Sequence, residues 1–318
     1  MVGNFAIAIV ILLIAVGFAW LARRAWGAKR AFIKWPSVVL SGLLTLIVGF
    51  VGIIMLIGFA QFYLPHGNPP TNLKVAATPE QIKRGEHIAG AFCAGCHAAN
   101  GNLPLSGGDD MGKDLPIPLG SFVPPNLTPG GPLKTWTDGE ILRALREGVD
   151  KNGQALFLMS TNNVRFLSDE DLQSVVAYLR NSPAVDNKTL EPPDQPSPLG
   201  AIFQALGMLP PPKPAVTAPI IAPAKAATVE YGKYILSYQD CRDCHGENLK
   251  GGTPGQLAPV GPNLQVVKGW TQEQFISTVR NGVDPSGHKL SPQMPWQQVG
   301  RLDDDELGAV YKYLSTLQ

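Results

Sequence analysis

Two long stretches without a charged residue lie within the first 65 residues of this chain. The first runs from Met1 to Ala22, and the second runs from Trp35 to Pro65. About 20 apolar residues suffice to cross a bilayer, and a helix satisfies its own backbone hydrogen bonds there. We therefore expect a hairpin of two transmembrane helices over residues 1–65. The alternative is a cleaved signal peptide, but no basic segment precedes the first stretch.

The turn between the two stretches sets the expected orientation of the hairpin. It carries five basic residues and no acidic one: Arg23, Arg24, Lys29, Arg30 and Lys34. Basic residues in short loops stay on the cytoplasmic side. We therefore predict a multi-pass protein of the cytoplasmic membrane, with loop 23–34 in the cytoplasm. The N-terminus and everything after Pro65 would then lie on the outer, periplasmic face.

The composition agrees with a membrane-anchored chain. Charged residues make up 16% of the sequence, whereas soluble domains contain about 25%. The net charge of +1 excludes an overall basic nucleic-acid-binding protein. Four cysteines in 318 residues are too few for a disulfide-rich scaffold.

All four cysteines fall in two copies of the pattern C-x-x-C-H. This is the attachment signature of c-type haem, in which two thiols bond to one porphyrin and the adjacent histidine binds its iron. A redox dithiol would not need the histidine, and a zinc site would need further cysteines or histidines at ligand spacing. The sequence therefore predicts two covalently bound haem c groups. The predicted attachment and iron-binding residues are Cys93, Cys96, His97, Cys241, Cys244 and His245.

The second axial ligand of each iron is expected to be a methionine. Met159 lies 62 residues after His97, and Met294 lies 49 residues after His245. Ligation by histidine and methionine raises the reduction potential of a haem. It also fills both axial positions, which argues against oxygen or peroxide chemistry at the iron.

Two nearby side chains are weaker candidates for these positions. Met111 is only 14 residues after the first motif, which is too close for the chain to pass around the porphyrin comfortably. His288 lies six residues before Met294, but its counterpart in the first half of the chain is Gln154.

The two halves of the chain repeat each other. Trp136-Thr137 matches Trp270-Thr271, and the matching segments continue beyond the methionines to the end of each half. Each half predicts a helix leading into the haem motif, a middle helix and a terminal helix. Residues 78–183 and 227–318 are thus two expected domains. The expected helix caps are Thr78, Thr137, Ser168, Thr271 and Asp303.

Two connecting segments complete the expected organisation. Residues 66–77 read as a short tether to the membrane. Residues 184–226 read as a semi-rigid, proline-rich linker, because residues 183–223 contain eleven of the 29 prolines. An apolar island, Leu199–Leu209, interrupts this linker and is expected to pack on a haem domain or on a partner protein.

The order of these motifs resembles the class I cytochrome c family in a tandem, two-haem arrangement. The first half is also similar to cytochrome subunits of bacterial membrane-bound dehydrogenases, and the layout resembles the dihaem subunit of cbb-type oxidases. The resemblance implies an all-α chain with two cytochrome c domains after the transmembrane hairpin. It also implies that the carbonyls of Pro125 and Pro262 accept hydrogen bonds from the haem-binding histidines. In one departure, Ser160 follows Met159 where the family usually has proline.

These features together predict a membrane-anchored dihaem cytochrome c that relays single electrons within a respiratory or photosynthetic chain. We expect an electron-transfer protein rather than an enzyme, acting as a subunit of a larger membrane complex. Its expected partners are other subunits, a donor and an acceptor protein and the lipid bilayer, but no nucleic acid. The alternatives are a dihaem peroxidase-like enzyme, with one haem lacking a methionine ligand, and a redox or gas sensor.

Overall fold

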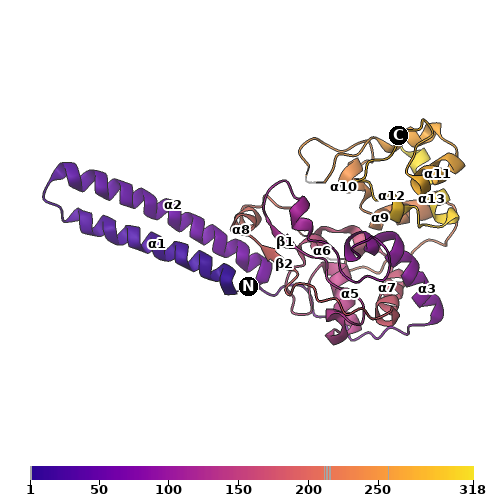
Figure 1. The fold of residues 1–318 in the computed structure, drawn as a ribbon, viewed down its shortest axis with the longest axis horizontal. Helices are drawn as coiled ribbons and strands as arrows, with labels where there is room; N and C mark the ends of the chain where they lie inside the picture. The colour runs from indigo at the N-terminus through magenta and orange to yellow at the C-terminus, as the bar shows by residue number, and fades with distance from the viewer. Residues whose placement is uncertain (1, 211, 213, 215, 257) are drawn as a thin grey trace.

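A computed structural model describes residues 2–210, 212, 214, 216–256 and 258–318 of the protein. Met1, three residues of the predicted linker and Leu257 of the second half lie outside the described residues. A two-helix hairpin projects from a globular part, and the N-terminus lies at the end of the hairpin beside that part (Figure 1). The hairpin therefore turns at the end that is remote from the globular part.

The hairpin consists of α1 (Val2–Trp26) and α2 (Ala31–Tyr63). Both helices have the length and composition of membrane spans. They pack closely, since a Cβ atom on Gly52 would lie 2.8 Å from a methyl carbon of Leu12. At the turn, Lys34 Nζ lies 4.7 Å from the centroid of the Trp26 ring. Such aromatic and basic residues mark the boundary between lipid and water.

In the first half of the globular part, short helices surround the C-x-x-C-H motif. The helix α3 begins at a capping box made by Thr78 and Gln81, and α5 begins at one made by Thr137 and Glu140. Ser168 caps the terminal helix, so the predicted caps of this half are confirmed. The elements are α3 (Pro79–Ile88), a π-helical turn η1 (Ala89–Cys93), α4 (Ala94–His97), η2 (Met111–Asp114), β1 (Gly120–Phe122), η3 (Pro132–Thr135), α5 (Asp138–Glu147), α6 (Phe157–Thr161), η4 (Asn163–Phe166) and α7 (Asp169–Asn181).

The second half follows the same order. Thr271 forms the predicted capping box, and the predicted cap Asp303 forms one as well, together with Glu306. Gly282 ends the middle helix with φ of +69°, as Gly148 does in the first half with +68°. A left-handed residue at this place favours glycine. The elements are α9 (Val229–Tyr238), α10 (Cys241–His245), η5 (Leu264–Gly269), α11 (Gln272–Asn281), α12 (Trp296–Val299) and α13 (Asp304–Thr316).

The segment that joins the halves is not an extended spacer over its first part. Val185 and Asn187 accept hydrogen bonds through their carbonyls from the Asn126 side chain. β2 (Asp194–Pro196) pairs antiparallel with β1, and α8 (Pro198–Ala205) packs against α2. The sequence predicted a semi-rigid linker between the two domains because this segment is rich in proline. The structure differs because residues distant in sequence supply partners for this backbone.

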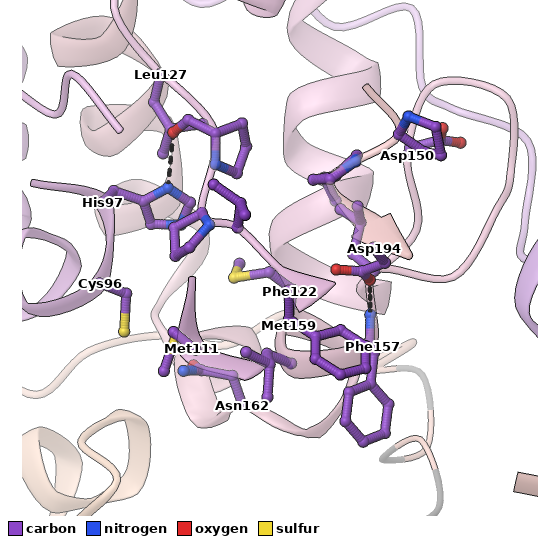
Figure 2. Close-up of a pocket in the computed structure, with 18 of the residues that line it drawn as sticks. Cys96, His97, Met111, Phe122, Leu127, Asp150, Phe157, Met159, Asn162 and Asp194 are labelled. Carbon is purple, nitrogen blue, oxygen red and sulfur yellow. Dashed lines mark hydrogen bonds between the residues drawn. The ribbon is translucent and has the colours of Figure 1, made fainter. Parts of the chain in front are cut away.

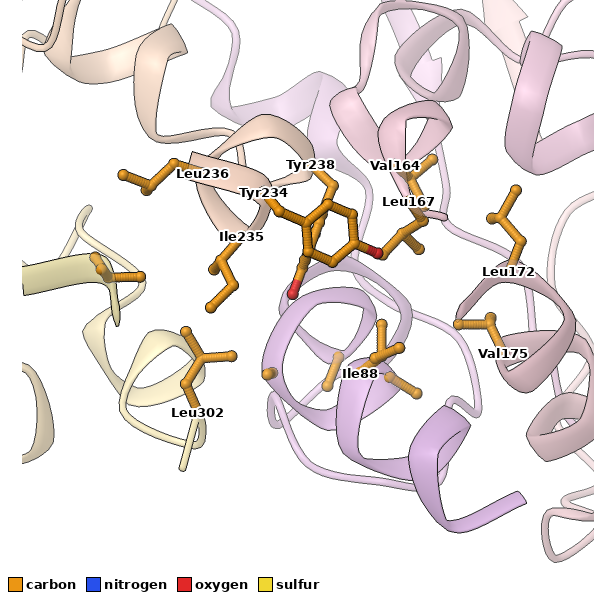
Figure 3. Packing of buried hydrophobic residues seen from close by; sticks show 14 of the residues in the cluster. Ile88, Val164, Leu167, Leu172, Val175, Tyr234, Ile235, Leu236, Tyr238 and Leu302 are labelled. Atoms are coloured by element: carbon orange, nitrogen blue, oxygen red, sulfur yellow. The ribbon is translucent and has the colours of Figure 1, made fainter. Parts of the chain in front are cut away.

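One hydrophobic core runs through both halves. In Figure 3, Ile88, Leu167 and Val175 of the first half lie near Tyr234 and Tyr238 of the second. A second cluster joins the end of α2 to the β1–β2 ribbon and α8. The halves are therefore packed on each other rather than separated by a spacer.

Charged and hydroxyl side chains join the halves where α3, α7, α9 and α13 meet. Arg84 donates two hydrogen bonds to Asp171, at 2.8 and 3.1 Å, and a third to Glu306 at 2.7 Å. Glu306 is fully buried, and its other oxygen lies 2.5 Å from His87 Nε2. Tyr234 donates a hydrogen bond of 2.5 Å to Asp171. The interface thus buries acids that are paired on several sides.

This interface has approximate two-fold symmetry. Gly85 and Gly232 are equivalent glycines, each in close contact with the backbone of the terminal helix of its own half. Two residues later, His87 and Tyr234 each reach the buried acid on the terminal helix of the other half. The repeated halves therefore meet as the two subunits of a symmetric dimer would.

Candidate haem sites

Both C-x-x-C-H motifs lie on a single helical turn. Cys93 ends the π-helical turn and His97 ends α4, whereas the whole second motif forms α10. One turn places the two thiols three residues apart on neighbouring positions, with the histidine next to the second thiol. His97 and His245 are 8% and 4% exposed. Each motif histidine is therefore buried at the end of a short helix.

Each motif histidine is oriented by a proline carbonyl. Nδ1 of His97 lies 3.1 Å from the carbonyl oxygen of Pro125, and Nδ1 of His245 lies 2.8 Å from that of Pro262. A carbonyl oxygen can only accept a hydrogen bond, so Nδ1 carries the ring proton and is the hydrogen-bond donor. This leaves Nε2 with a lone pair for a metal. The structure thus contains both hydrogen bonds that the family resemblance implied.

The backbone around the two histidines is also repeated. Gly107 donates to the His97 carbonyl and Gly251 donates to the His245 carbonyl, both at 2.8 Å. Next to Gly107, a Cβ atom on Gly108 would lie 1.8 Å from the carbonyl oxygen of Cys96. Glycine at this place lets the loop close over the motif.

A cavity of about 1360 Å³ opens beside the first motif. Figure 2 shows His97, Met111 and Met159 around it. Most of its lining is apolar, including Leu127 and Phe122. Four residues of the second half complete the wall, so the two halves share it: Asp240, Asp243, Gln256 and Ala258.

Met159 and Met111 both line this cavity. Met159 lies on the short helix α6, and Met111 begins the 3₁₀ turn η2. The sequence separation argued against Met111, yet the loop after the motif returns to the same cavity. Two methionines are thus available on the wall, and Met159 stays our predicted ligand.

The helix that carries Met159 is held from two sides. Phe157, its first residue, donates its backbone N–H to the Asp194 carboxylate at 2.5 Å (Figure 2). Burial raises the pKa of Asp194 to about 7, although this hydrogen bond opposes the shift. Ser160 is buried and donates to the Phe157 carbonyl at 2.8 Å. The serine that departs from the family pattern is therefore a hydrogen-bonded part of α6.

Asp194 is a residue that the sequence reasoning missed. It lies in the segment assigned to the linker and reaches the cavity only because β2 pairs with β1, where Asp194 faces Phe122. No local pattern marks such a residue, since its partner Phe157 is 37 positions away.

The second site places Met294 in a turn before α12, where its side chain is half-buried. His288, the alternative ligand, has a side chain that is 73% exposed and lies 3.8 Å from Asp284. The His288 side chain therefore lies mostly in solvent, whereas the Met294 side chain is half-buried. Met294 stays our predicted axial ligand of the second haem iron.

The first thiol of each motif has the properties of a protected rather than a reactive group. Burial raises the pKa of both Cys93 and Cys241 to about 12, so each is a neutral thiol at pH 7. A redox-active dithiol requires the opposite shift. Burial also raises the pKa of Cys96 and of Cys244. Covalent haem attachment fits this donor set, because each motif pairs two thiols with one imidazole that a proline carbonyl orients. An apolar cavity beside the first of them suits a porphyrin.

Comparison with known proteins agrees with this assignment. The family model described as cytochrome c matches residues 82–183 and 229–318, which is more than half of the chain. The chain is 25% identical over 271 residues to the gluconate 2-dehydrogenase cytochrome c subunit of Pantoea cypripedii, covering 74% of this chain and 59% of that protein.

Two further relatives carry similar names. The cytochrome c subunit of the quinone alcohol dehydrogenase of Gluconacetobacter polyoxogenes is 25% identical, over 76% of this chain and 58% of that protein. The fructose dehydrogenase cytochrome subunit of Gluconobacter japonicus is 28% identical over 31% of this chain and 23% of that protein. The chain thus spans less than three fifths of the length of the alcohol dehydrogenase subunit and about a quarter of the length of the fructose dehydrogenase subunit.

Proposed function

The chain belongs to the cytochrome c family, and from that premise we propose that it is a membrane-anchored dihaem electron carrier. The cofactor of the family is covalently bound haem c. We propose two such groups, held by Cys93, Cys96 and His97 in the first half and by Cys241, Cys244 and His245 in the second. Met159 and Met294 would complete the coordination of the two irons.

Each haem iron, when present, supplies a one-electron couple between Fe(III) and Fe(II). The chain's own residues prepare this couple. The carbonyls of Pro125 and Pro262 fix the orientation of the histidine rings and increase their basicity. The apolar side chains of the first cavity would limit the access of water to the haem, and a sulfur ligand would favour the reduced iron.

The observation that carries the proposal is the contact between the halves. Residues of the second half, among them Asp240 and Asp243, line the cavity of the first half on the side of Cys96. Asp240 lies directly before Cys241, the first thiol of the second motif. The two attachment helices thus lie across one packed interface, which supports electron transfer between two haems within one chain.

We further propose that the protein is a subunit of a membrane-bound oxidoreductase in a respiratory chain. The names of its relatives support a dehydrogenase as electron donor. The membrane hairpin supports assembly with other subunits, with loop 23–34 in the cytoplasm and the haem domains on the periplasmic side. In this assignment the chain itself transfers electrons, and the substrate is oxidised by a partner.

The haem count and the partners test this proposal directly. The purified chain should give two haem c groups per polypeptide by pyridine haemochrome assay. Near-infrared spectra of the oxidised protein should show methionine-to-iron bands for both haems. Purification in mild detergent should retain a dehydrogenase subunit that reduces both haems when its substrate is added. One haem without a methionine band, together with peroxide turnover, would instead indicate the peroxidase-like enzyme.

A further inference from the structure

The segment around α8 exposes large apolar side chains and has no charged residue among them. Residues 195–212 contain no charged residue. Leu199, Leu206 and Met208 are 36%, 50% and 57% exposed. Burying one such side chain is worth about 1.5–3 kcal/mol, so a surface with three of them favours an apolar environment.

This segment is fixed to the outer part of the membrane hairpin. A Cβ atom on Gly58 of α2 would lie 1.8 Å from the carbonyl oxygen of Ala201, so α8 lies directly on α2. Ala201 and Phe59 are fully buried in the cluster that joins the two helices. Figure 1 shows α8 beside the end of α2 that faces the globular part.

The expected depth of α8 follows from the length of α2. The hydrocarbon core is about 30 Å thick and takes about 20 helical residues. The turn of the hairpin, with Lys34 and Trp35 beside Trp26, marks one lipid boundary. About 20 residues from Trp35, α2 reaches Met55, and Gly58 therefore lies at the opposite boundary. This places α8 in the headgroup layer.

We propose that residues 198–209 form a lipid-binding surface that lies in the outer interface of the bilayer. Leu199, Leu206 and Met208 insert among the acyl chains there. The occupant is lipid rather than a protein because the surface continues that of α2, whose neighbouring Ile53 and Ile57 are 53% and 43% exposed.

Such a surface would act as a second anchor. The hairpin alone leaves the globular part able to tilt, whereas α8 is tied to that part through β2, its ribbon partner β1 and the buried Leu119. Insertion of α8 would therefore set the orientation of the haem domains relative to the membrane.

Site-directed spin labelling of the complete haem-loaded chain in lipid nanodiscs tests the proposal. Leu206→Cys provides the label at the surface, and Ile221→Cys is the matched control, because Ile221 is apolar and 88% exposed but outside α8. The nanodiscs contain phosphatidylcholine and phosphatidylglycerol. Collisions with oxygen, which concentrates in lipid, are compared with collisions with a water-soluble nickel chelate.

The label at position 206 should show a several-fold higher ratio of oxygen to nickel collisions than the label at position 221. Met208→Cys should give the same result if Leu206→Cys does not fold. Equal ratios at 206 and 221 would overturn the proposal. Protection from both reagents, or protection that appears only with co-purified subunits, would also overturn it, since a protein would then cover the surface. Labelling of the parent chain would reveal free native thiols and would count against the proposed haem attachment instead.

Discussion

Replacing Glu306 with glutamine tests whether the polar cluster holds the two halves together. Burial by itself would raise the pKa of Glu306, but His87 and Arg84 outweigh it through hydrogen bonds and charge and lower the pKa to about 2. The ordinary value is 4.5. At about 1.4 kcal/mol per pKa unit, this shift corresponds to about 3 kcal/mol of stability at pH 7.

The sign of the pH dependence follows from the direction of the shift. A carboxylate with a lowered pKa stabilises the folded state fully above its unfolded pKa and loses that effect as the pH falls through its folded pKa. Glutamine resembles the protonated acid, so Glu306→Gln should lose about 3 kcal/mol at pH 7. The difference from the parent chain should shrink between pH 4.5 and pH 2.

Guanidinium unfolding of the detergent-solubilised holoprotein measures this difference. Trp270 and Trp296 report on the second half by fluorescence, and equal slopes in both proteins are required for the comparison. Asp304→Asn is the matched control, because Asp304 starts the same helix in a pair with Arg280 but is 74% exposed. The loss of folding stability caused by Asp304→Asn should stay below about 1 kcal/mol. The reasoning is refuted if Glu306→Gln costs no more than this control, or if its deficit stays constant down to pH 3.

Three further predictions concern the first haem site and the anchor. Met159→Leu should abolish one near-infrared methionine band and lower the potential of one haem, whereas Met111→Leu should preserve the band; the reverse pattern would make Met111 the ligand. Asp194→Ala should weaken the same band and destabilise α6 by about 1–3 kcal/mol, because the N–H of Phe157 loses its acceptor; an unchanged spectrum and melting curve would exclude this role. Gly58→Val should separate α8 from α2, since its Cβ atom would lie 1.8 Å from a backbone oxygen; proteolysis near α8 should then become faster, and unaltered proteolysis would contradict the contact.

Local sequence was sufficient for the parts of the fold that depend on neighbouring residues. Uncharged runs of sufficient length predicted α1 and α2, and the capping boxes at Thr78, Thr137 and Thr271 predicted the starts of three helices. The two C-x-x-C-H motifs predicted the cofactor class, because the spacing of thiols and imidazole on one turn is itself the chemical requirement. The hydrogen bonds to Pro125 and Pro262 followed from the family resemblance.

Only the tertiary structure decided which distant surfaces meet. Arg84 pairs with Glu306 across 222 positions, and Asp194 reaches Phe157 through a strand pairing that proline content concealed. The packing of α8 against Gly58 of α2 depends on the close approach of two backbones, and no residue pattern in the sequence indicates that approach. Such contacts are set by the fit and desolvation of two complete surfaces, and neither surface exists until its own segments have folded. The sequence therefore determined which chemistry each half can carry, and the packing decided how the halves face each other and the membrane.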